Sequence, residues 1–301
     1  MWVLLAVFSA ILLGTYDVAK KQALRKNGTF AVLLVATALS TLFVSPFLRI
    51  GPAEDHLKLA LKAVLVTASW VSGMEGLKRL PLTTVSTIKG SRPVFVVLFS
   101  IILFGERLNW MQWLGIAIVL GALYMLGFTS RRDASAQVRK TGFIWMGISV
   151  LTGVASALYD KYIMKGMEPM FVQSWTNLFI TVILALCVLV KRLAISGRAS
   201  SDRLRPRSRE WEGALPARSD KFRWDWTLVL VAVLITAADA LYFFALKQPD
   251  ALLSIISVVR RASVLVTFVL GAIIFHEGNI RAKGLNMLLM AAGVVLLLIG
   301  S

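Results

Sequence analysis

Three basic residues lie inside long apolar runs, where charge is costly. Arg260 and Arg261 are adjacent in one such run, and Lys89 occupies the corresponding place in an earlier run. On insertion scales each charged side chain costs about 2.5–3.5 kcal/mol at the centre of a membrane helix. A planar guanidinium can bind phosphate or carboxylate bidentately, and an ammonium adds a point charge. These residues therefore predict an anion-binding site at membrane depth, which Arg92, one helical turn after Lys89, can extend.

Four acidic residues in similar runs are candidate partners for these cations or candidate coupling groups: Asp17, Glu75, Asp160 and Asp239. Asp17 and Glu75 have basic residues three and four positions further on, so local pairs near a helix end can account for both. Asp239 is nearest the middle of its run and has no local basic partner. We therefore expect Asp239 to pair with an intramembrane cation or to carry a coupling proton. Permanent pairing of the cations with acids is the alternative to an anion site.

Three tyrosines close to these acids can offer hydroxyl groups to a polar ligand. Tyr16 and Tyr159 each precede an aspartate, and Tyr242 follows Asp239 by about one helical turn. A tyrosine near a helix end is commonly an anchor at the membrane interface instead. The sequence leaves both roles open for all three.

The composition identifies the class of protein that must position these residues. The 301 residues are 57% hydrophobic, with a mean hydropathy of +0.75, far above a soluble domain. A membrane helix needs about 20 apolar residues. On that measure we predict an all-α polytopic membrane protein with ten transmembrane helices, at residues 2–21, 29–48, 59–79, 83–104, 109–128, 142–163, 170–191, 226–246, 252–275 and 282–300.

The chain also repeats itself at corresponding places in its two halves. The matches pair Glu106 with Glu277 and Lys89 with Arg260 at an offset of 171 residues, and Tyr16-Asp17 with Tyr159-Asp160 at an offset of 143. Each repeat then holds five helices, an odd number, so the second copy must be inverted relative to the first. Inverted repeats are typical of carriers that work by alternating access.

The two offsets differ by 28 residues, which indicates an insertion in the second half. We place a first five-helix repeat at 1–130, a linker at 131–141 and a second five-helix repeat at 142–301. The insertion is a basic loop at 192–225, which has no helical apolar period and which we predict to be flexible. Its basic residues can act as a topology determinant or contact anionic lipid headgroups.

The chain has a net charge of +17. Its basic residues are distributed by membrane topology and are not gathered on one face of a folded domain. Lys and Arg are concentrated in the connections after the first, third, fifth, seventh and ninth segments, and cytoplasmic loops are the basic ones. This bias places both termini outside the cell. The sequence shows no pattern typical of nucleic-acid binding, so we predict no nucleic-acid partner.

The junction between the fourth and fifth segments resembles a known family. Pro93, Phe104-Gly-Glu-Arg-Leu108 and Gln112-Trp-Leu-Gly115 are similar to the signature of the drug/metabolite transporter superfamily, in its EamA-like ten-helix branch. The second repeat fits the same pattern but has Val264 for the proline and His276 for the glycine. The resemblance implies a 5+5 inverted repeat around a central cavity and transport without ATP hydrolysis. Members commonly have both termini in the cytoplasm, the opposite of what the loop charges indicate.

A second resemblance concerns the basic residues. The phosphate translocators of the same superfamily exchange sugar phosphates for phosphate, and they carry a lysine on the fourth helix and two adjacent basic residues on the ninth. Lys89, Arg260 and Arg261 match that pattern, with Arg260 in place of the usual lysine. The resemblance implies a phosphorylated substrate.

From these observations we expect a secondary active transporter of a small organic anion, phosphorylated, which works by alternating access and by exchange. The alternatives are a proton-coupled transporter of amino acids or other polar metabolites, a flippase of a phosphorylated lipid carrier, and a non-transporting membrane receptor or scaffold. We expect no enzymatic activity, cofactor or metal, because no catalytic or metal-ligand motif occurs. We expect a monomer, in contact with membrane lipids, in the bacterial cytoplasmic (inner) membrane.

Overall fold

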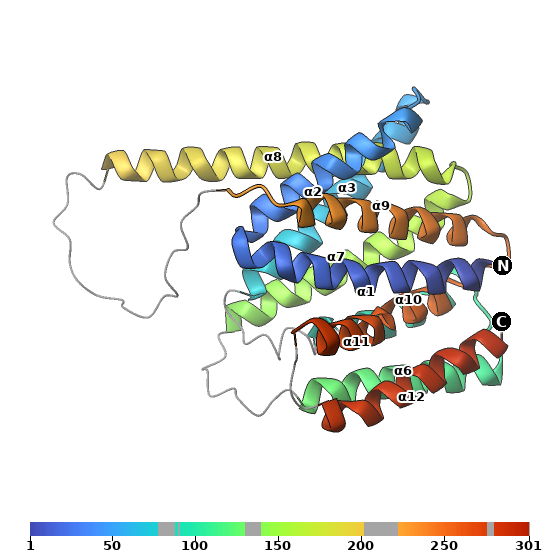
Figure 1. Cartoon of the computed structure of the whole chain (residues 1–301). Coiled ribbons are helices and arrows are strands. Elements are labelled where there is room, and N and C mark those ends of the chain that lie inside the picture. Colours follow the sequence, from blue (N-terminus) through green and yellow to red (C-terminus); the bar gives the residue numbers. More distant parts are fainter. Residues whose placement is uncertain (78–87, 90, 130–139, 202–221, 276–279, 301) are drawn as a thin grey trace.

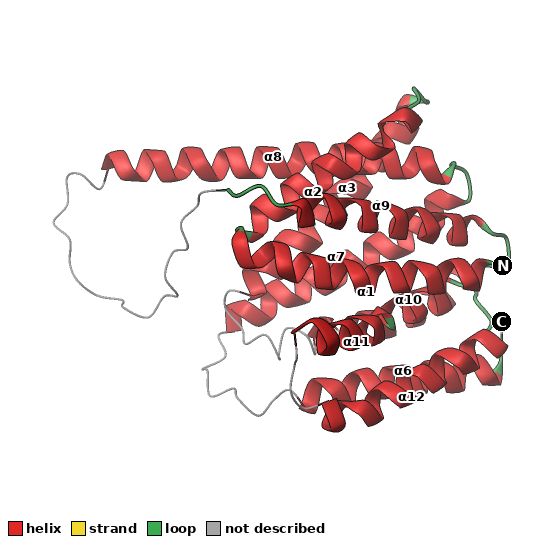
Figure 2. Cartoon of the chain, viewed as in Figure 1, coloured by secondary structure: helices red, strands yellow, loops and turns green. Residues whose placement is uncertain are grey.

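The computed structural model describes residues 1–77, 88–89, 91–129, 140–201, 222–275 and 280–300. Every regular element in these ranges is a helix, which confirms the all-α prediction (Figures 1 and 2). The elements are α1 (Trp2–Lys26), α2 (Thr29–Val44), the 3-10 helix η1 (Ser45–Phe47), α3 (Ala53–Leu77), α5 (Arg92–Phe104), α6 (Trp110–Thr129), α7 (Lys140–Met164), α8 (Pro169–Ser201), α9 (Trp226–Lys247), α10 (Leu253–Arg261), α11 (Ser263–Phe275) and α12 (Ile280–Ile299).

Six helical segments of the described residues are long and apolar enough to cross a membrane. They are Trp2–Leu24, Phe30–Phe47, Ala53–Gly76, Thr141–Met164, Pro169–Val190 and Trp226–Lys247. Three further apolar helices, Arg92–Phe104, Trp110–Met125 and Leu288–Ile299, are shorter. An apolar helix of about 20 residues spans the hydrocarbon core, whereas a shorter one needs a continuation or a neighbour. The chain is thus a helical membrane protein, and the count of ten spans stays a prediction.

The segment predicted as one helix at 252–275 is broken directly after the arginine pair. Helix α10 ends at Arg261, Ala262 is a turn, and α11 begins at Ser263. The Ala262 N–H is shared between the carbonyl oxygens of Val258 and Val259, at 3.2 and 3.0 Å. A continuous hydropathy pattern conceals such a break, because the apolar residues continue on both sides of it. The prediction of an unbroken helix was wrong.

The segment predicted at 83–104 has a turn at the equivalent place. Residues 88 and 89 are helical, Ser91 is a turn, and α5 begins at Arg92. Helices α5 and α11 both contain 13 residues and begin 171 positions apart, the offset that pairs Lys89 with Arg260. Both groups of predicted basic residues therefore flank a helix break.

Helix α8 continues further than the sequence pattern predicted. It ends at Ser201, so residues 192–201 of the predicted basic loop are helical. Alanine, leucine and arginine in this stretch have high helix propensities. Residues 202–221 of the predicted loop lie outside the described residues. Most of the predicted linker at 131–141 does so as well.

The two predicted repeats are interleaved rather than separate. Helix α1 packs antiparallel against α9, and α7 packs against α3 in the same way, while α2 contacts α9 and α8 contacts α3. The helices approach closely because small residues face each other: the Ser69 hydroxyl donates to the Ser149 carbonyl oxygen at 2.8 Å, and the Ser149 hydroxyl donates to the Ser69 carbonyl oxygen at 2.7 Å. Helices α6 and α12 form a pair at one side of the bundle, and both chain termini lie at the same end (Figure 1).

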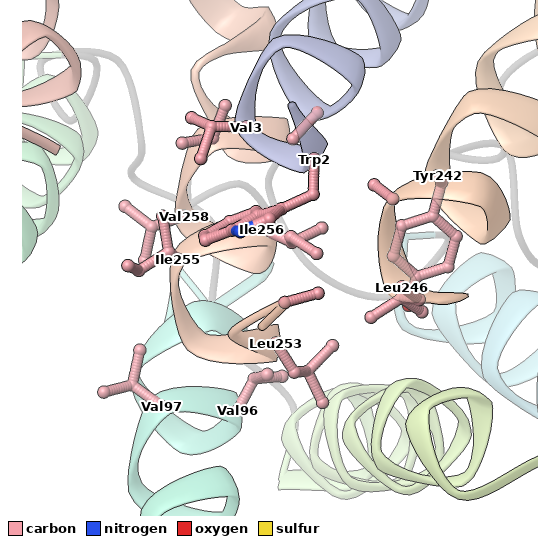
Figure 3. Close-up of a cluster of buried hydrophobic side chains, with 14 of the residues drawn as sticks. Trp2, Val3, Val96, Val97, Tyr242, Leu246, Leu253, Ile255, Ile256 and Val258 are labelled. Atoms are coloured by element: carbon pink, nitrogen blue, oxygen red, sulfur yellow. The ribbon is translucent and has the colours of Figure 1, made fainter. Parts of the chain in front are cut away.

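Helix α10 lies in the centre of the main hydrophobic cluster, between α1, α5 and α9 (Figure 3). The side chains of Leu253, Ile255, Ile256 and Val258 are fully buried. Trp2 and the α9 residues Tyr242 and Leu246 surround them, as do Val96 and Val97 of α5. Because this nine-residue helix is packed on all sides, the backbone positions of its last residues are fixed by the core.

The α6–α12 pair gives a test of this packing. A Cβ atom added at Gly115 would lie 2.8 Å from the Leu297 Cγ and 2.9 Å from the Gly293 carbonyl oxygen, whereas one added at Gly121, on the same helix, meets nothing within 4 Å. We expect Gly115→Ala to destabilise the purified protein by about 1–3 kcal/mol. Gly121→Ala is the matched control and should stabilise by up to about 1 kcal/mol. Equal thermal stabilities of the two variants would contradict the close contact.

Candidate functional site

The break after α10 places the arginine pair at the carbonyl end of a short helix. Arg260 and Arg261 are the last two residues of α10. The C-terminus of a helix carries a partial negative charge, which stabilises cations in the last turn. Unsatisfied carbonyl groups at a broken helix are tolerated within a membrane where they line a protein or ligand site. The local fold thus provides part of the compensation that two adjacent arginines need at this depth.

Arg260 forms an ion pair with Asp239, the acid that the sequence favoured as an intramembrane partner. The Arg260 Nη2 lies 2.7 Å from the Asp239 Oδ1, and the side chains are 18% and 33% exposed. The guanidinium carbon of Arg260 also lies 4.0 Å from the centroid of the Tyr242 ring. A guanidinium over an aromatic face gains a cation–π interaction. Arg260 is therefore held by a carboxylate and by a ring.

A second ion pair is sealed inside the bundle. The Lys62 Nζ lies 2.8 Å from the Asp160 Oδ1, and the two side chains are 3% and 9% exposed. The Tyr242 hydroxyl donates to the Asp160 Oδ2 at 3.2 Å, and the Lys62 ammonium lies 3.9 Å from the Phe243 ring centroid. Tyr242 thus bonds one ion pair through its hydroxyl and supports the other with its ring.

The sequence analysis missed Lys62. The predicted third segment began at residue 59, which put Lys62 near a helix end, where a lysine can reach the interface. Helix α3 begins at Ala53 instead, so Lys62 is its tenth residue and lies well inside the helix. The start of this helix was the signal that could have found it: Glu54 and Asp55 lie in its first turn, where acidic residues favour a helix N-terminus.

Arg92 reaches across to helix α7. Its guanidinium donates to the Gly153 carbonyl oxygen. A Cβ atom added at Gly153 would lie 2.7 Å from the Arg92 Cζ and 2.9 Å from the Ser69 hydroxyl, so only glycine leaves space for the guanidinium here. Arg92 also interacts electrostatically with Asp160, Arg260 and Arg261. Charges of both ion pairs and of Arg261 therefore act on Arg92.

Lys89 and Arg261 interact electrostatically with each other. Lys89 interacts electrostatically with Lys20, Arg92 and Arg261, and Asp17 is the carboxylate that acts on it. Asp17 acts on Arg261 as well. Lys89 and Asp17 are solvent-accessible. The structure thus brings together the four basic residues that the sequence singled out.

Other predicted site residues lie elsewhere or have other partners. Tyr159 stacks on Tyr162, with ring centroids 5.8 Å apart, and no described cation of the group above acts on it. Tyr16 lies under the Lys20 ammonium, at 5.2 Å from its ring centroid. Glu75, near the C-terminal end of α3, makes a polar interaction of its own. The roles of all the predicted site residues in binding or coupling stay predictions.

We define the charge cluster as the ionisable residues of the helix bundle that these interactions connect. Its members are the basic residues Lys20, Lys62, Lys89, Arg92, Arg260 and Arg261 and the acidic residues Asp17, Asp160 and Asp239. Among the residues that the structure describes, the cluster thus holds six cations and three carboxylates, and counting Glu75 as a fourth acid would still leave two surplus positive charges. The buried Nε atoms of Arg260 and Arg261 have no hydrogen-bond partner. A surplus of positive charge that is shielded from water favours the binding of a further negative charge.

Glu106 ties three helices together at the end of the bundle that holds the termini. Its carboxylate accepts hydrogen bonds from the Leu253 N–H at 2.7 Å, the Ser254 N–H at 3.1 Å and the Lys161 ammonium at 2.8 Å. It thereby caps α10, whose own N-cap residue, Leu252, has no capping side chain. Burial alone would raise the pKa of Glu106, but the hydrogen bonds from Lys161 and Ser254 outweigh it and hold the pKa below its usual value.

Comparison with known proteins agrees with a membrane carrier. Residues 1–128 match the EamA-like transporter family. An uncharacterized transporter in the cobO 3′ region of Sinorhizobium sp is 29% identical over 136 residues, which cover 42% of this chain and 95% of the relative. A solved crystal structure of another protein has a similar fold, with a TM-score of 0.73 at 15% identity. The match covers 98% of this chain and 95% of the other chain.

These findings support a membrane transporter that contains an EamA-like region in its first half. The crystal structure extends the fold, though not the family, to the second half, because its sequence identity is low. Among the described residues, no three His, Cys, Asp or Glu side chains gather as a metal site requires. None of these comparisons names a phosphate translocator, so the resemblance to that branch rests on the basic residues alone.

The Glu106 contact gives a pH-dependent test. Glu106→Gln keeps the shape of the side chain but removes the charge that Lys161 and α10 bind, and loss of one partner of a buried pair costs roughly 3–5 kcal/mol. We expect a lower thermal stability at neutral pH. Because the pKa of Glu106 is lowered in the folded protein, its contribution is present above the usual carboxyl range and is lost as the pH falls through the lowered value. The difference from the unmodified protein should therefore shrink below about pH 4.

The matched control is Glu54→Gln. Glu54 pairs with Lys58 at 2.6 Å on the exposed first turn of α3, where ion pairs contribute little. Thermal unfolding of the purified protein measures both effects. A loss for Glu106→Gln no greater than that for Glu54→Gln, or one independent of pH, would contradict the capping role.

Proposed function

We propose that this chain is a secondary active transporter of a small organic anion, and specifically of a phosphorylated one. In this proposal the EamA-like architecture extends over the whole chain as ten membrane spans in two inverted five-helix repeats. The substrate binds to the basic side of the charge cluster, and alternating access of the two repeats carries it across the membrane without ATP hydrolysis.

The surplus of positive charge in the charge cluster carries this proposal. Its cations come from α1, α3, the helical residues 88–89 before the Ser91 turn, α5 and α10, so helices from both repeats contribute to it. Guanidinium groups bind phosphate and carboxylate oxygens in pairs, and lysine adds a point charge. An anion that enters would supply the missing negative charge and the missing hydrogen-bond acceptors.

The helix bounds support the inverted repeat. Helices α5 and α11 have equal lengths at an offset of 171 residues, and the turns at Ser91 and Ala262 occupy equivalent places. The packing of α1 on α9 corresponds to that of α7 on α3 when the repeats are exchanged. Carriers with inverted repeats commonly place substrate sites at such discontinuous helices.

The same charge surplus favours exchange over uniport. A site that crosses the membrane empty would move with its surplus cations uncompensated, whereas a bound anion lowers that cost. The protein would therefore return fastest with a second anion in place of the first. We place it in the bacterial cytoplasmic membrane. We propose a monomer, because ten helices can enclose the site without a partner.

Asp239 favours a second candidate function, proton-coupled transport of amino acids or other polar metabolites. Its carboxylate is one-third exposed and pairs with Arg260. A substrate that drew Arg260 away would leave a carboxylate at membrane depth, and such a group tends to take up a proton. In that mechanism the cations are counter-ions and not the binding site.

The first test is ligand binding. We expect inorganic phosphate or a phosphate monoester to raise the thermal stability of the purified protein, because a ligand that binds the folded state alone stabilises it by about 2.7 kcal/mol at one hundred times its Kd. Amino acids serve as the comparison set. Stabilisation by amino acids with none by any phosphate would contradict the anion proposal and favour the second candidate.

The second test separates exchange from proton coupling. We expect uptake of labelled phosphate into proteoliposomes to be faster when they contain unlabelled phosphate than when they contain none. Asp239→Asn should leave this ratio above one. Equal rates in loaded and empty vesicles would refute exchange, and uptake that follows an imposed pH gradient and loses this dependence in Asp239→Asn would support the second candidate.

A further inference from the structure

The junction between α5 and α6 turns one acidic side chain into the bundle. Helix α5 ends at Phe104, and Gly105 follows it in the left-handed conformation, with φ at 64°. Glycine adopts this conformation without the strain that a side chain would cause. After this turn, the Glu106 side chain is only 2% exposed. The junction also lies close to the C-terminus of the chain, because the Asn109 side chain donates to the Gly300 carbonyl oxygen at 2.8 Å.

Glu106 connects helices of both predicted repeats at the end of the bundle that holds the two chain termini, which we call the terminal end (Figure 1). Its carboxylate accepts from the N–H groups of Leu253 and Ser254 at the start of α10. It also accepts from the Lys161 ammonium of α7 at 2.8 Å. The same ammonium donates to the Ala251 carbonyl oxygen, in the connection before α10, at 2.5 Å. Separation of the two repeats at this end would break these contacts.

Two lysines one helical turn apart lie against the same aromatic ring, but they differ in their acidic partner. The Lys161 Nζ lies 5.6 Å from the centroid of the Phe104 ring, and the Lys165 Nζ lies 5.5 Å from it. Both distances permit a cation–π interaction. Lys161 is paired with Glu106, whereas Lys165 forms no ion pair with any carboxylate in the described part of the chain. Lys165 is therefore a matched control for Lys161.

Apolar side chains fill the bundle next to this ion pair. Trp2 of α1 and Val96 of α5 share one hydrophobic cluster with Leu253 and Ile256 of α10 (Figure 3). All four are buried, and the two α10 side chains are completely so. Beyond the opposite end of α5, by contrast, Lys89 is exposed. The structure is thus closed by packing at the terminal end and exposes charge at the other end of α5.

We propose that the Glu106–Lys161 ion pair is a latch, which holds the terminal end closed and which breaks when the transporter opens towards that side of the membrane. This inference rests on the proposed function, because alternating access requires each end to open in turn. The latch lies outside the charge cluster and contacts none of its members. It acts on the conformation of the carrier and not on the ligand.

The latch belongs to one end of the molecule. The offset of 143 residues that pairs Asp160 with Asp17 also pairs Lys161 with Val18. A valine cannot bind a carboxylate, so the matching position of the first repeat cannot form the same ion pair. The latch therefore stabilises closure at the terminal end alone. Its loss shifts the population towards molecules that are open at this end.

A buried serine next to the latch can report this opening. Ser100 lies on α5 one turn before Phe104, on the helix face that carries Val96 and Val97, and it is fully buried. Ser100→Cys replaces a hydroxyl group with a thiol of similar size. A Cys187→Ser background removes the exposed native thiol. The measurement is the rate at which a charged, water-soluble thiol reagent modifies the purified full-length protein.

We expect Lys161→Met to increase the modification rate of Ser100→Cys roughly 10-fold, because the open population rises when a charge-assisted hydrogen bond of the closed state is lost. The α10 N–H groups keep their bonds to Glu106 in this variant, so the fold is retained. Lys165→Met should change the rate less than about twofold, since Lys165 is exposed and unpaired with any described carboxylate. Lys161→Arg keeps the charge and should stay close to the unmodified rate.

A second reporter separates the latch from a general loosening of the fold. Ser9 is also fully buried, and its hydroxyl donates to the Ala238 carbonyl oxygen between α1 and α9, two helices that the latch does not contact. Lys161→Met should leave the modification rate of Ser9→Cys unchanged. An equal rise at both reporters, or no rise at Ser100→Cys, would overturn the latch.

The labelling experiment needs no ligand, so its outcome is independent of the substrate. Failure of the unmodified protein to bind any phosphate would refute the proposed substrate class and leave a selective rise at Ser100→Cys as evidence for the latch. Phosphate binding without that rise would refute the latch and leave the proposed function standing.

Discussion

The cost of placing charge inside a membrane is the constraint on which the rest of this structure depends. Helix α10 is short and buried, and its last two residues are arginines. Three neighbouring groups lower the free-energy cost of these charges. The helix C-terminus acts on both arginines, and the Asp239 carboxylate and the Tyr242 ring act on Arg260. At the opposite end of the same helix, Glu106 supplies the capping group that Leu252 lacks. The helix is thus held by electrostatic interactions at both ends and by apolar packing between them.

The interleaved packing of the two predicted repeats explains how distant parts of the chain build one charge cluster. Because α1 packs on α9 and α7 packs on α3, each pair combines helices from both repeats. Asp160 of α7 meets Lys62 of α3, and Arg92 of α5 meets Gly153 of α7. A movement of one repeat relative to the other would therefore change these contacts directly.

The division between satisfied and unsatisfied cations connects structure to transport. The ion pairs lower the cost of the buried charges, whereas in the proposed function the remaining surplus attracts an anionic ligand. The proposed anion carrier needs both, because full neutralisation would abolish binding and a larger surplus would destabilise the empty protein. The Lys62–Asp160 pair and the Arg260–Asp239 pair belong to the first class.

Apolar runs by themselves determined the membrane class, the helical fold and the position of most helices, because hydropathy depends on local composition. The sequence also singled out Lys89, Arg92, Arg260, Arg261 and Asp239, since charge in an apolar run is visible without a structure. It could not reveal the break at Ala262, which interrupts hydrogen bonding and not hydropathy. Lys62 was missed because its depth depends on where α3 begins, although the acidic first turn of that helix marks its start. Which cation faces which carboxylate was decided by tertiary structure alone. Partners such as Lys62 and Asp160 are about one hundred residues apart, and only the packing of α3 on α7 brings them within 2.8 Å.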